Sequence, residues 1–228
     1  MLLNLASTAP HIHPADKWQE TAPNSESFVL HKTSDAAVEV GLARWLDGSM
    51  AFQPPNDMLF YFMNGGGVFR GANGEEIHVT PGKIVHFKHG WRGTLETLVG
   101  PIEASYMTCP GAPGESVKTL PDAFTAAPLS DWGEIPSRVE GTPHTSGILL
   151  SRDPDGRAES GIWTCTPGLW RCEVTSDEFC HFLEGSCTYT HDNGERIEIQ
   201  PDTLACFPRG WSGLCEIRRA MRKVYMIR

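Results

Sequence analysis

The amino-acid passage at residues 41–107 occurs a second time at residues 161–227, displaced by 120 positions. Aligned without a gap, the two copies share fifteen identical positions. Most of these are glycines, aromatic residues and a proline, which shape turns or anchor a core, as in the pairs Gly65/Gly185, Pro81/Pro201 and Trp91/Trp211. A repeat of this kind predicts two copies of one domain in a single chain.

Short apolar segments separated by turn residues run through both copies. In the first copy they include Leu59–Met63, Ile77–Val79 and Ile84–Phe87, with turns at Asn73-Gly74 and Pro81-Gly82. Segments rich in β-branched and aromatic residues, joined by Asn-Gly turns, are typical of antiparallel sandwiches and barrels. No stretch combines a 3.6-residue apolar period with capping residues. We therefore predict an all-β chain with little helix.

Changes in composition separate the two copies from the rest of the chain. Residues 1–24 are polar and are interrupted by three prolines, which predicts an N-terminal arm. Residues 109–130 begin with a Pro- and Gly-rich run, the composition of a linker. We expect the first β domain at residues 25–108 and the second at residues 131–228.

Charge and cysteine content narrow the classes of function. The formal net charge of −9 repels phosphate backbones and disfavours nucleic acid as a partner. No apolar run reaches the length of a membrane helix, and the first residues lack the basic and apolar regions of a secretory signal. We expect a cytoplasmic protein with no membrane partner. Its seven cysteines form no C-x-x-C pair, so we expect free thiols rather than a zinc ribbon.

The second copy resembles the cupins. The residues that carry the resemblance are Gly161–Gly168, Asp177–Gly185, Asp192–Gly194, Pro201-Asp202, Phe207–Gly213 and Arg222–Tyr225. They are most similar to a small subfamily that includes ethanolamine-utilisation Q-type proteins and is neighbour to the ureidoglycine aminohydrolases. The resemblance implies a jelly-roll barrel, and the repeat extends it to two tandem cupin barrels, a bicupin. Because cupins commonly dimerise, it also implies a homodimer.

The resemblance also implies where a metal would be held. Cupins usually bind metal through three histidines and one glutamate, and Glu178 falls on the glutamate position. The histidine positions fall near Cys172 and Val174 and on Gly213. In the first copy the four positions hold Phe52, Pro54, Met58 and Gly93. We therefore expect no metal ligands of the usual kind and no cofactor, with a divalent transition metal in a non-standard site as the alternative.

Glu178 is the residue that we expect to carry any chemistry. Inside the barrel it would bind a polar ligand or act as a general acid or base, and we class it as the candidate catalytic residue. The alternative is a structural carboxylate paired with Arg171 or Arg209. Cys172 and Cys180 share its side of an alternating strand pattern, and Cys206 is expected to line the same cavity. These thiols are either ligand-binding groups or small core residues.

Aromatic residues supply the expected cavity walls. In the second barrel the candidate ligand-binding residues are Trp163, Phe182 and Trp211, and sequence alone does not distinguish cavity lining from core packing. In the first barrel we expect Tyr61 and His86 to form a polar pocket with Glu96.

Two classes of function follow. We expect a bicupin that binds a small polar metabolite without metal, its first barrel being mainly structural. The alternative is an enzyme acting on such a metabolite, aminohydrolase-like or isomerase-like, through a non-standard metal site. Fold alone does not choose between them, because cupins host many activities.

Overall fold

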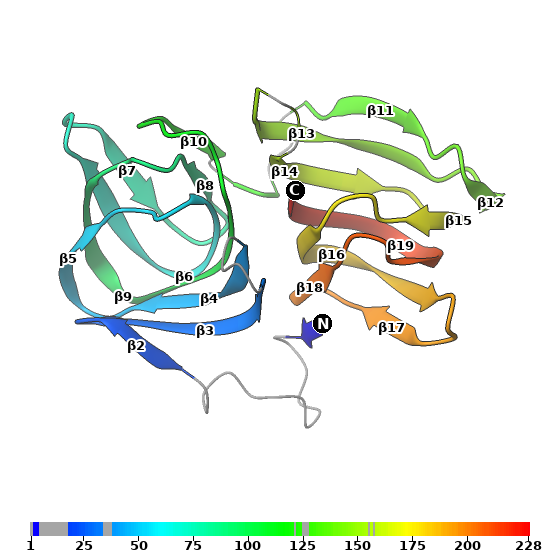
Figure 1. Ribbon diagram of the computed structural model, residues 1–228, viewed down its shortest axis with the longest axis horizontal. Coiled ribbons are helices and arrows are strands. Elements are labelled where there is room, and N and C mark those ends of the chain that lie inside the picture. Colours follow the sequence, from blue (N-terminus) through cyan, green and yellow to red (C-terminus); the bar gives the residue numbers. More distant parts are fainter. Residues whose placement is uncertain are drawn as a thin grey trace. The chain divides into compact units, whose positions relative to one another are not determined.

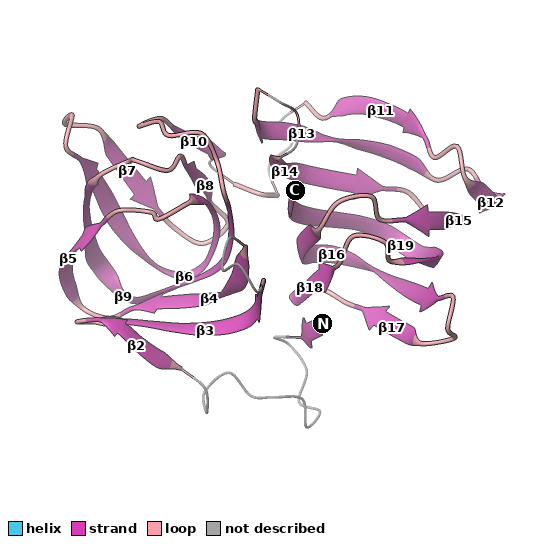
Figure 2. Cartoon of the chain, in the orientation of Figure 1, coloured by secondary structure: helices cyan, strands magenta, loops and turns pink. Residues whose placement is uncertain are grey.

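The computed structural model describes residues 2–4, 18–33, 38–120, 122–124, 128–154, 156 and 158–228. These residues contain nineteen strands and no helix, which confirms the prediction of an all-β chain (Figure 2). The chain divides into two compact units, Ile12–Thr125 and Ala126–Arg228 together with Met1–His11. We call them the first and the second barrel. No helix in the described part of the chain is long and apolar enough to cross a membrane.

The first barrel is an antiparallel sheet in the order β10-β8-β6-β9-β4-β3-β2, with β5 added to β9 and β7 to β6 (Figure 1). Its strands are β2 (Gln19–Ala22), β3 (Ser25–Lys32), β4 (Glu39–Trp45), β5 (Gly48–Phe52), β6 (Asp57–Gly71), β7 (Glu76–Val79), β8 (Ile84–Phe87), β9 (Gly93–Cys109) and β10 (Val117–Leu120). The long strands β6 and β9 each pair with several neighbours, and this lets one sheet curl around a core.

The second barrel repeats this plan in the order β1-β18-β16-β19-β14-β13-β11, with β15 between β19 and β12 and with β17 on β16. Its strands are β11 (Ser130–Glu134), β12 (Arg138–Gly141), β13 (His144–Arg152), β14 (Glu159–Cys165), β15 (Gly168–Glu173), β16 (Glu178–His191), β17 (Arg196–Ile199), β18 (Thr203–Phe207) and β19 (Ser212–Ile227). The two tandem barrels predicted from the repeat are thus present.

Three strands, β1, β2 and β10, lie in segments that the sequence predicts to be an arm and a linker. Strand β1 (Leu2–Asn4) pairs antiparallel with β18, setting Leu2 opposite Ala205. The N-terminus therefore covers an edge of the second barrel, where unpaired backbone groups would otherwise be open. Within residues 109–130, β10 pairs with β8 of the first barrel. Residues 5–17 of the expected arm lie outside the described residues.

The repeat holds in the structure with one insertion. The Asn-Gly turns match, because Gly74 and Gly194 both have positive φ and each preceding Asn accepts a backbone hydrogen bond two residues on. In the first barrel Gly41 lies opposite Tyr106, and in the second Gly161 lies opposite Tyr225, so the displacement there is 119. Strand β9 carries one extra residue near Gly100-Pro101. The alignment without a gap is therefore wrong beyond that point, by one residue.

Candidate functional site

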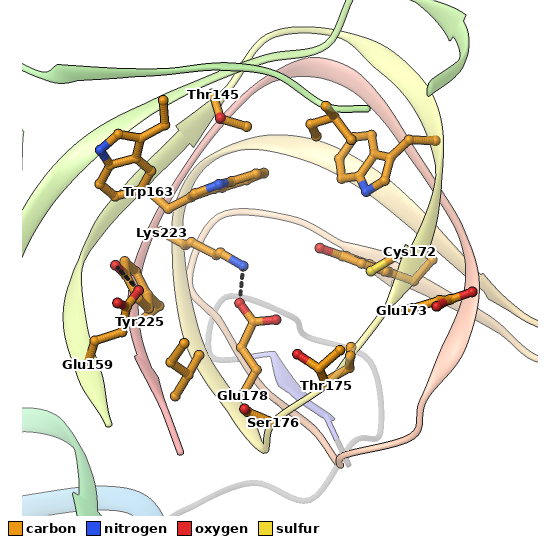
Figure 3. A pocket seen from close by; sticks show the side chains of 16 residues that line it. Thr145, Glu159, Trp163, Cys172, Glu173, Thr175, Ser176, Glu178, Lys223 and Tyr225 are labelled. Carbon is orange, nitrogen blue, oxygen red and sulfur yellow. Dashed lines mark hydrogen bonds and ion pairs between the residues drawn. The ribbon is translucent and has the colours of Figure 1, made fainter. Parts of the chain in front are cut away.

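A cavity of ≈ 380 Å³ lies inside the second barrel (Figure 3). Aromatic and polar side chains share its wall, which comprises Trp132, Ile135, Thr145, Glu159, Trp163, Trp170, Cys172, Glu173, Val174, Thr175, Ser176, Glu178, Tyr189, Lys223, Tyr225 and Ile227. Three of the predicted site residues, Trp163, Cys172 and Glu178, are therefore brought together. Its volume is in the range of small-molecule pockets.

An ion pair between Glu178 and Lys223 forms the polar centre of this cavity. Glu178 opens β16, and Phe182, four residues on, lies opposite Lys223 of β19. The Lys223 Nζ donates to Glu178 Oε1 at 2.5 Å, as Figure 3 shows. It also stands 4.6 Å from the ring centroid of Trp163 and 5.6 Å from that of Phe182. The expected alternative partners of Glu178 were arginines, but Arg171 pairs with Asp192 instead.

Lys223 carries its charge although it is only 5% exposed. Burial lowers the pKa of this lysine, but the contacting carboxylate of Glu178 raises it, and its pKa lies above the usual value. A buried ammonium is costly unless it is paired. Glu178, whose side chain is 23% exposed, thus both neutralises Lys223 and reaches the cavity.

The thiols near this pair are protonated at neutral pH. Cys180 is fully buried and its Sγ donates to Glu178 Oε1 at 3.4 Å. Burial and then the charge of Glu178 raise the pKa of Cys180 well above its usual value. The same two causes raise the pKa of Cys172, which lines the cavity, to about 11. A thiolate nucleophile at either position would have to form against both effects.

A second carboxylate stands on another wall, held by its own partners. Glu159 Oε1 accepts a hydrogen bond from the Tyr225 hydroxyl at 3.0 Å, and Oε2 accepts from Arg152 Nε at 2.9 Å. Burial and the charge of Glu159 raise the pKa of Tyr225, so its hydroxyl remains a donor. Tyr225 therefore orients Glu159 within the cavity wall, and Arg152, which lies outside that wall, neutralises its charge.

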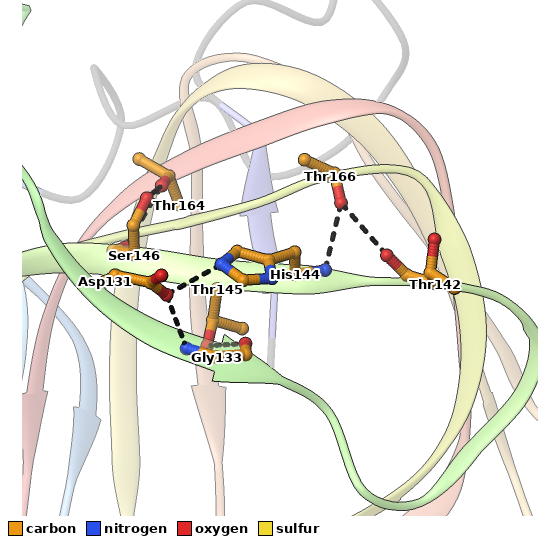
Figure 4. Close-up of polar contacts among 8 residues, drawn as sticks. All are labelled: Asp131, Gly133, Thr142, His144, Thr145, Ser146, Thr164 and Thr166. Carbon is orange, nitrogen blue, oxygen red and sulfur yellow. Dashed lines mark hydrogen bonds and ion pairs between the residues drawn. The ribbon is translucent and has the colours of Figure 1, made fainter.

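A β-bulge brings Trp132 into the cavity wall. Asp131 lies opposite Ser146 and Gly133 opposite Thr145, so Trp132 is the extra residue of β11. Asp131 Oδ1 accepts from Gly133 N at 2.8 Å and contacts His144 Nε2 at 2.7 Å, which fixes the bulge to β13 (Figure 4). A Cβ at Gly147 would lie 2.4 Å from the Trp132 ring, so only glycine leaves room for it.

The other predicted residues of the second barrel lie outside the cavity wall. Phe182 packs beneath the ion pair, and Trp211 packs against Phe207 and Tyr189 in the core. Cys206 lies between Ala205 and Phe207, whose side chains fill that core, so it faces the opposite side of β18. Side chains alternate along a strand, and this parity separates Cys206 from the cavity.

The same parity applies to Tyr61 and His86 in the first barrel. Their neighbours Phe60 and Val85 fill the core, so Tyr61 and His86 face outward from their strands. His86 Nε2 lies 3.9 Å from Asp57 Oδ2, and Glu96 pairs with Arg70 on the surface. The expected polar pocket of Tyr61, His86 and Glu96 is therefore not formed.

The first barrel has a cavity of its own, of ≈ 400 Å³, with a different lining. The ladder register sets Met58 where the second barrel has Glu178, and Ala104 where it has Lys223. The Tyr–Glu pair is kept, because Tyr106 donates to Glu39 at 2.5 Å. The remaining wall is mainly apolar and includes Trp45, Met50, Phe52 and Phe60.

Sequence reasoning missed Lys223. The alignment without a gap set it against Glu103, another charged residue, whereas the structure sets it against Ala104. The alternation of side chains along a strand is the signal that could identify it, because Lys223 lies two residues from both Met221 and Tyr225, which face the core from β19. Trp132 gave no periodic signal, because the bulge that aims it is a local departure from the strand pattern.

The donors at the cavity do not match the usual cupin metal set. Cys172, Val174 and Glu178 do meet at the cavity, where the resemblance placed three of the ligands. Only one of them is a carboxylate, and its Oε1 is bonded to an ammonium that would repel a metal cation. No group of three or more His, Cys, Asp or Glu side chains is arranged to hold a metal among the described residues.

Comparison with known proteins shows which family and which solved structures this chain resembles. Residues 152–225 match the EutQ-like cupin domain family, and no curated protein matches the chain. A DUF861 family protein of unknown function from Pseudomonas syringae pv. tomato str. DC3000 is 12% identical, with a TM-score of 0.74 over 88% of this chain and 85% of that chain. Protein Ylba from E. coli, also of DUF861, is 12% identical, with a TM-score of 0.65 over 99% and 89%.

A third solved structure is that of oxalate decarboxylase from Bacillus subtilis, a protein with Mn(II) centers. It is 12% identical, with a TM-score of 0.53 over 100% of this chain and 76% of that chain. Identities this low show a shared fold alone. Residues 152–225 thus match the EutQ-like cupin domain family, and the chain as a whole has the bicupin architecture of two tandem jelly-roll barrels.

Proposed function

We propose that the second barrel binds a small polar metabolite, with the Glu178–Lys223 pair as its polar centre and without the metal that many cupins use. The observation that carries the proposal is the position of this pair. Glu178 lines a cavity of ≈ 380 Å³ and is held by a lysine buried behind it. A fixed carboxylate surrounded by aromatic side chains can orient a polar ligand and bury its apolar part.

Contrast with the first barrel supports this assignment. Met58 and Ala104 there replace Glu178 and Lys223, so an equivalent fold is built without the ion pair. A buried ion pair is not needed to stabilise such a barrel, and apolar residues often serve as well. The pair in the second barrel therefore calls for another reason, and ligand binding supplies one.

The test uses variants that copy the first barrel into the second. Thermal-shift screening of small polar metabolites would be run on the wild type and on Glu178→Met/Lys223→Ala. A ligand that binds only the native state raises the midpoint through RT ln(1 + [L]/Kd). We expect stabilising ligands for the wild type whose effect is lost in the double variant. Equal stabilisation of both proteins, or of neither, would reject this cavity as the binding site.

Elemental mass spectrometry of untagged protein, prepared without chelator, separates the two classes of function. We expect no stoichiometric metal in the wild type or in Glu178→Ala. Near-stoichiometric metal that is lost in Glu178→Ala would instead support an enzyme with a non-standard metal site. Cys172, the cysteine that lines the cavity, would then be the first ligand to examine beside Glu178.

A further inference from the structure

We propose that the ligand of the second barrel is a small organic cation, a protonated or quaternary amine with apolar substituents. This inference rests on the proposed function and names the ligand class. It starts from the charges on the cavity wall, where Glu178 is paired with Lys223 and Glu159 is paired with Arg152, which lies outside the wall. The third carboxylate, that of Glu173, adds a further negative charge, so an anionic ligand would meet like charge.

The charged groups that remain available to a ligand are carboxylates, beside the hydroxyl groups of Thr175 and Ser176. Both oxygens of Glu159 are engaged, by Tyr225 and by Arg152. The Lys223 ammonium is bonded to Glu178 Oε1 and almost fully buried, so it offers little to a second anion. Glu178 Oε2 has no hydrogen-bond partner in the described part of the chain, and Glu173 lies exposed at the end of β15. A bound ammonium would pair with these oxygens.

The aromatic part of the wall fits the same class of ligand. Trp132, Trp163 and Trp170 line the cavity, and the ring centroids of Trp163 and Trp170 are 6.5 Å apart. Tryptophan faces attract cations more strongly than other aromatic rings, especially where water is excluded. The barrel already uses this attraction once, since Lys223 Nζ stands 4.6 Å from the ring centroid of Trp163. Apolar substituents of the ligand would pack on Trp132 and Trp170.

The proposal is tested with three probes of one shape and different charge: n-pentylammonium, 1-pentanol and pentanoate. Their binding to the full-length protein would be measured by isothermal titration calorimetry at neutral pH. We expect the ammonium to bind at least about tenfold more tightly than the alcohol, and the carboxylate not to bind. Raising the salt concentration should weaken ammonium binding and leave alcohol binding unchanged.

Substitutions test whether the carboxylates of Glu178 and Glu173 cause the preference for the ammonium probe. Glu178→Gln and Glu173→Gln should each weaken ammonium binding several-fold without weakening 1-pentanol binding. Glu195→Gln, at an exposed turn of the same barrel, should change neither. Glu173→Gln keeps the test valid if Glu178→Gln unfolds, because Glu173 forms no part of the buried pair.

The outcomes separate this inference from the function on which it rests. Preferential binding of pentanoate, no binding of the ammonium at millimolar concentration, or ammonium binding that both Gln variants leave intact would overturn the cation assignment. If other metabolites still bind the wild type and not Glu178→Met/Lys223→Ala, the proposed function stands and the ligand class alone is wrong. If no metabolite distinguishes these two proteins, both fail.

Discussion

Lys223 occupies in the second barrel the ladder position that Ala104 occupies in the first. Lys223 lies opposite Trp163 and Phe182, and Ala104 lies opposite Ala43 and Phe62. The same strand pairing thus surrounds a charge in one barrel and a methyl group in the other. Since the backbone plan is shared, the difference in chemistry resides in a few inward side chains.

Replacing Glu178 alone and replacing Lys223 alone should lower the unfolding free energy by different amounts. Glu178→Met leaves the Lys223 ammonium buried without its partner, and we expect a loss of about 3 to 5 kcal/mol in unfolding free energy. Lys223→Met leaves Glu178, which still reaches water, so its cost should be smaller. Glu178→Met/Lys223→Ala should be close to wild type. Urea unfolding of the four proteins gives the comparison, and equal losses in both single variants would count against the pair.

Cys172 should be the thiol that reacts in the folded protein, and its reaction should need high pH. It is the one cysteine of the seven that is not buried. Because burial raises its pKa to about 11, the reactive thiolate is scarce at pH 8 and increases until that value. The rate of iodoacetamide labelling, located by peptide mass spectrometry, should rise about tenfold per unit between pH 8 and 10. A plateau near pH 9 would show an ordinary thiol.

Trp132 should contribute more to ligand binding than to stability. Its side chain is partly exposed and is aimed by a bulge at the edge of the sheet. We expect Trp132→Ala to change the unfolding free energy by at most about 1 kcal/mol. The same variant should weaken the binding of the ligands found in the screen about tenfold. Val139→Ala, at another exposed residue of the barrel, is the matched control and should leave affinity unchanged.

Strand β1 should protect the backbone of β18. The pairing of Leu2–Asn4 with Thr203–Ala205 uses an edge that would otherwise be open. Deletion of residues 2–4 should speed amide hydrogen exchange in β18 by at least about tenfold. Exchange in β8, which is paired on its outer side by β10, should not change. Unaltered exchange in β18 would mean that the edge gains no protection from the N-terminus.

The sequence predicted the fold well because the repeat lies in residues that shape turns. Gly74 and Gly194, for example, carry the positive φ that their Asn-Gly turns require. Glu178 and Cys172 were found because strand parity and the family resemblance agreed on one side of the sheet. The predictions for Tyr61, His86 and Cys206 are wrong, because the apolar neighbours of these residues take the core side of each strand.

The rest of the site depends on features that sequence does not display. Lys223 was hidden by one inserted residue near Gly100-Pro101, which shifted the comparison of the two barrels. Trp132 reaches the cavity through a bulge, and Gly147 permits it by leaving space for the ring. Such details are set by pairing partners distant in the chain rather than by local pattern.

The Glu178–Lys223 pair is the proposed ligand-binding centre of the second barrel. The most direct measurement is calorimetric titration of a ligand found in the screen into the wild type and into Glu178→Met/Lys223→Ala, with both folds confirmed by circular dichroism. We expect a saturable transition for the wild type and at least about a hundredfold weaker binding for the double variant. Equal affinity in the two folded proteins would contradict it.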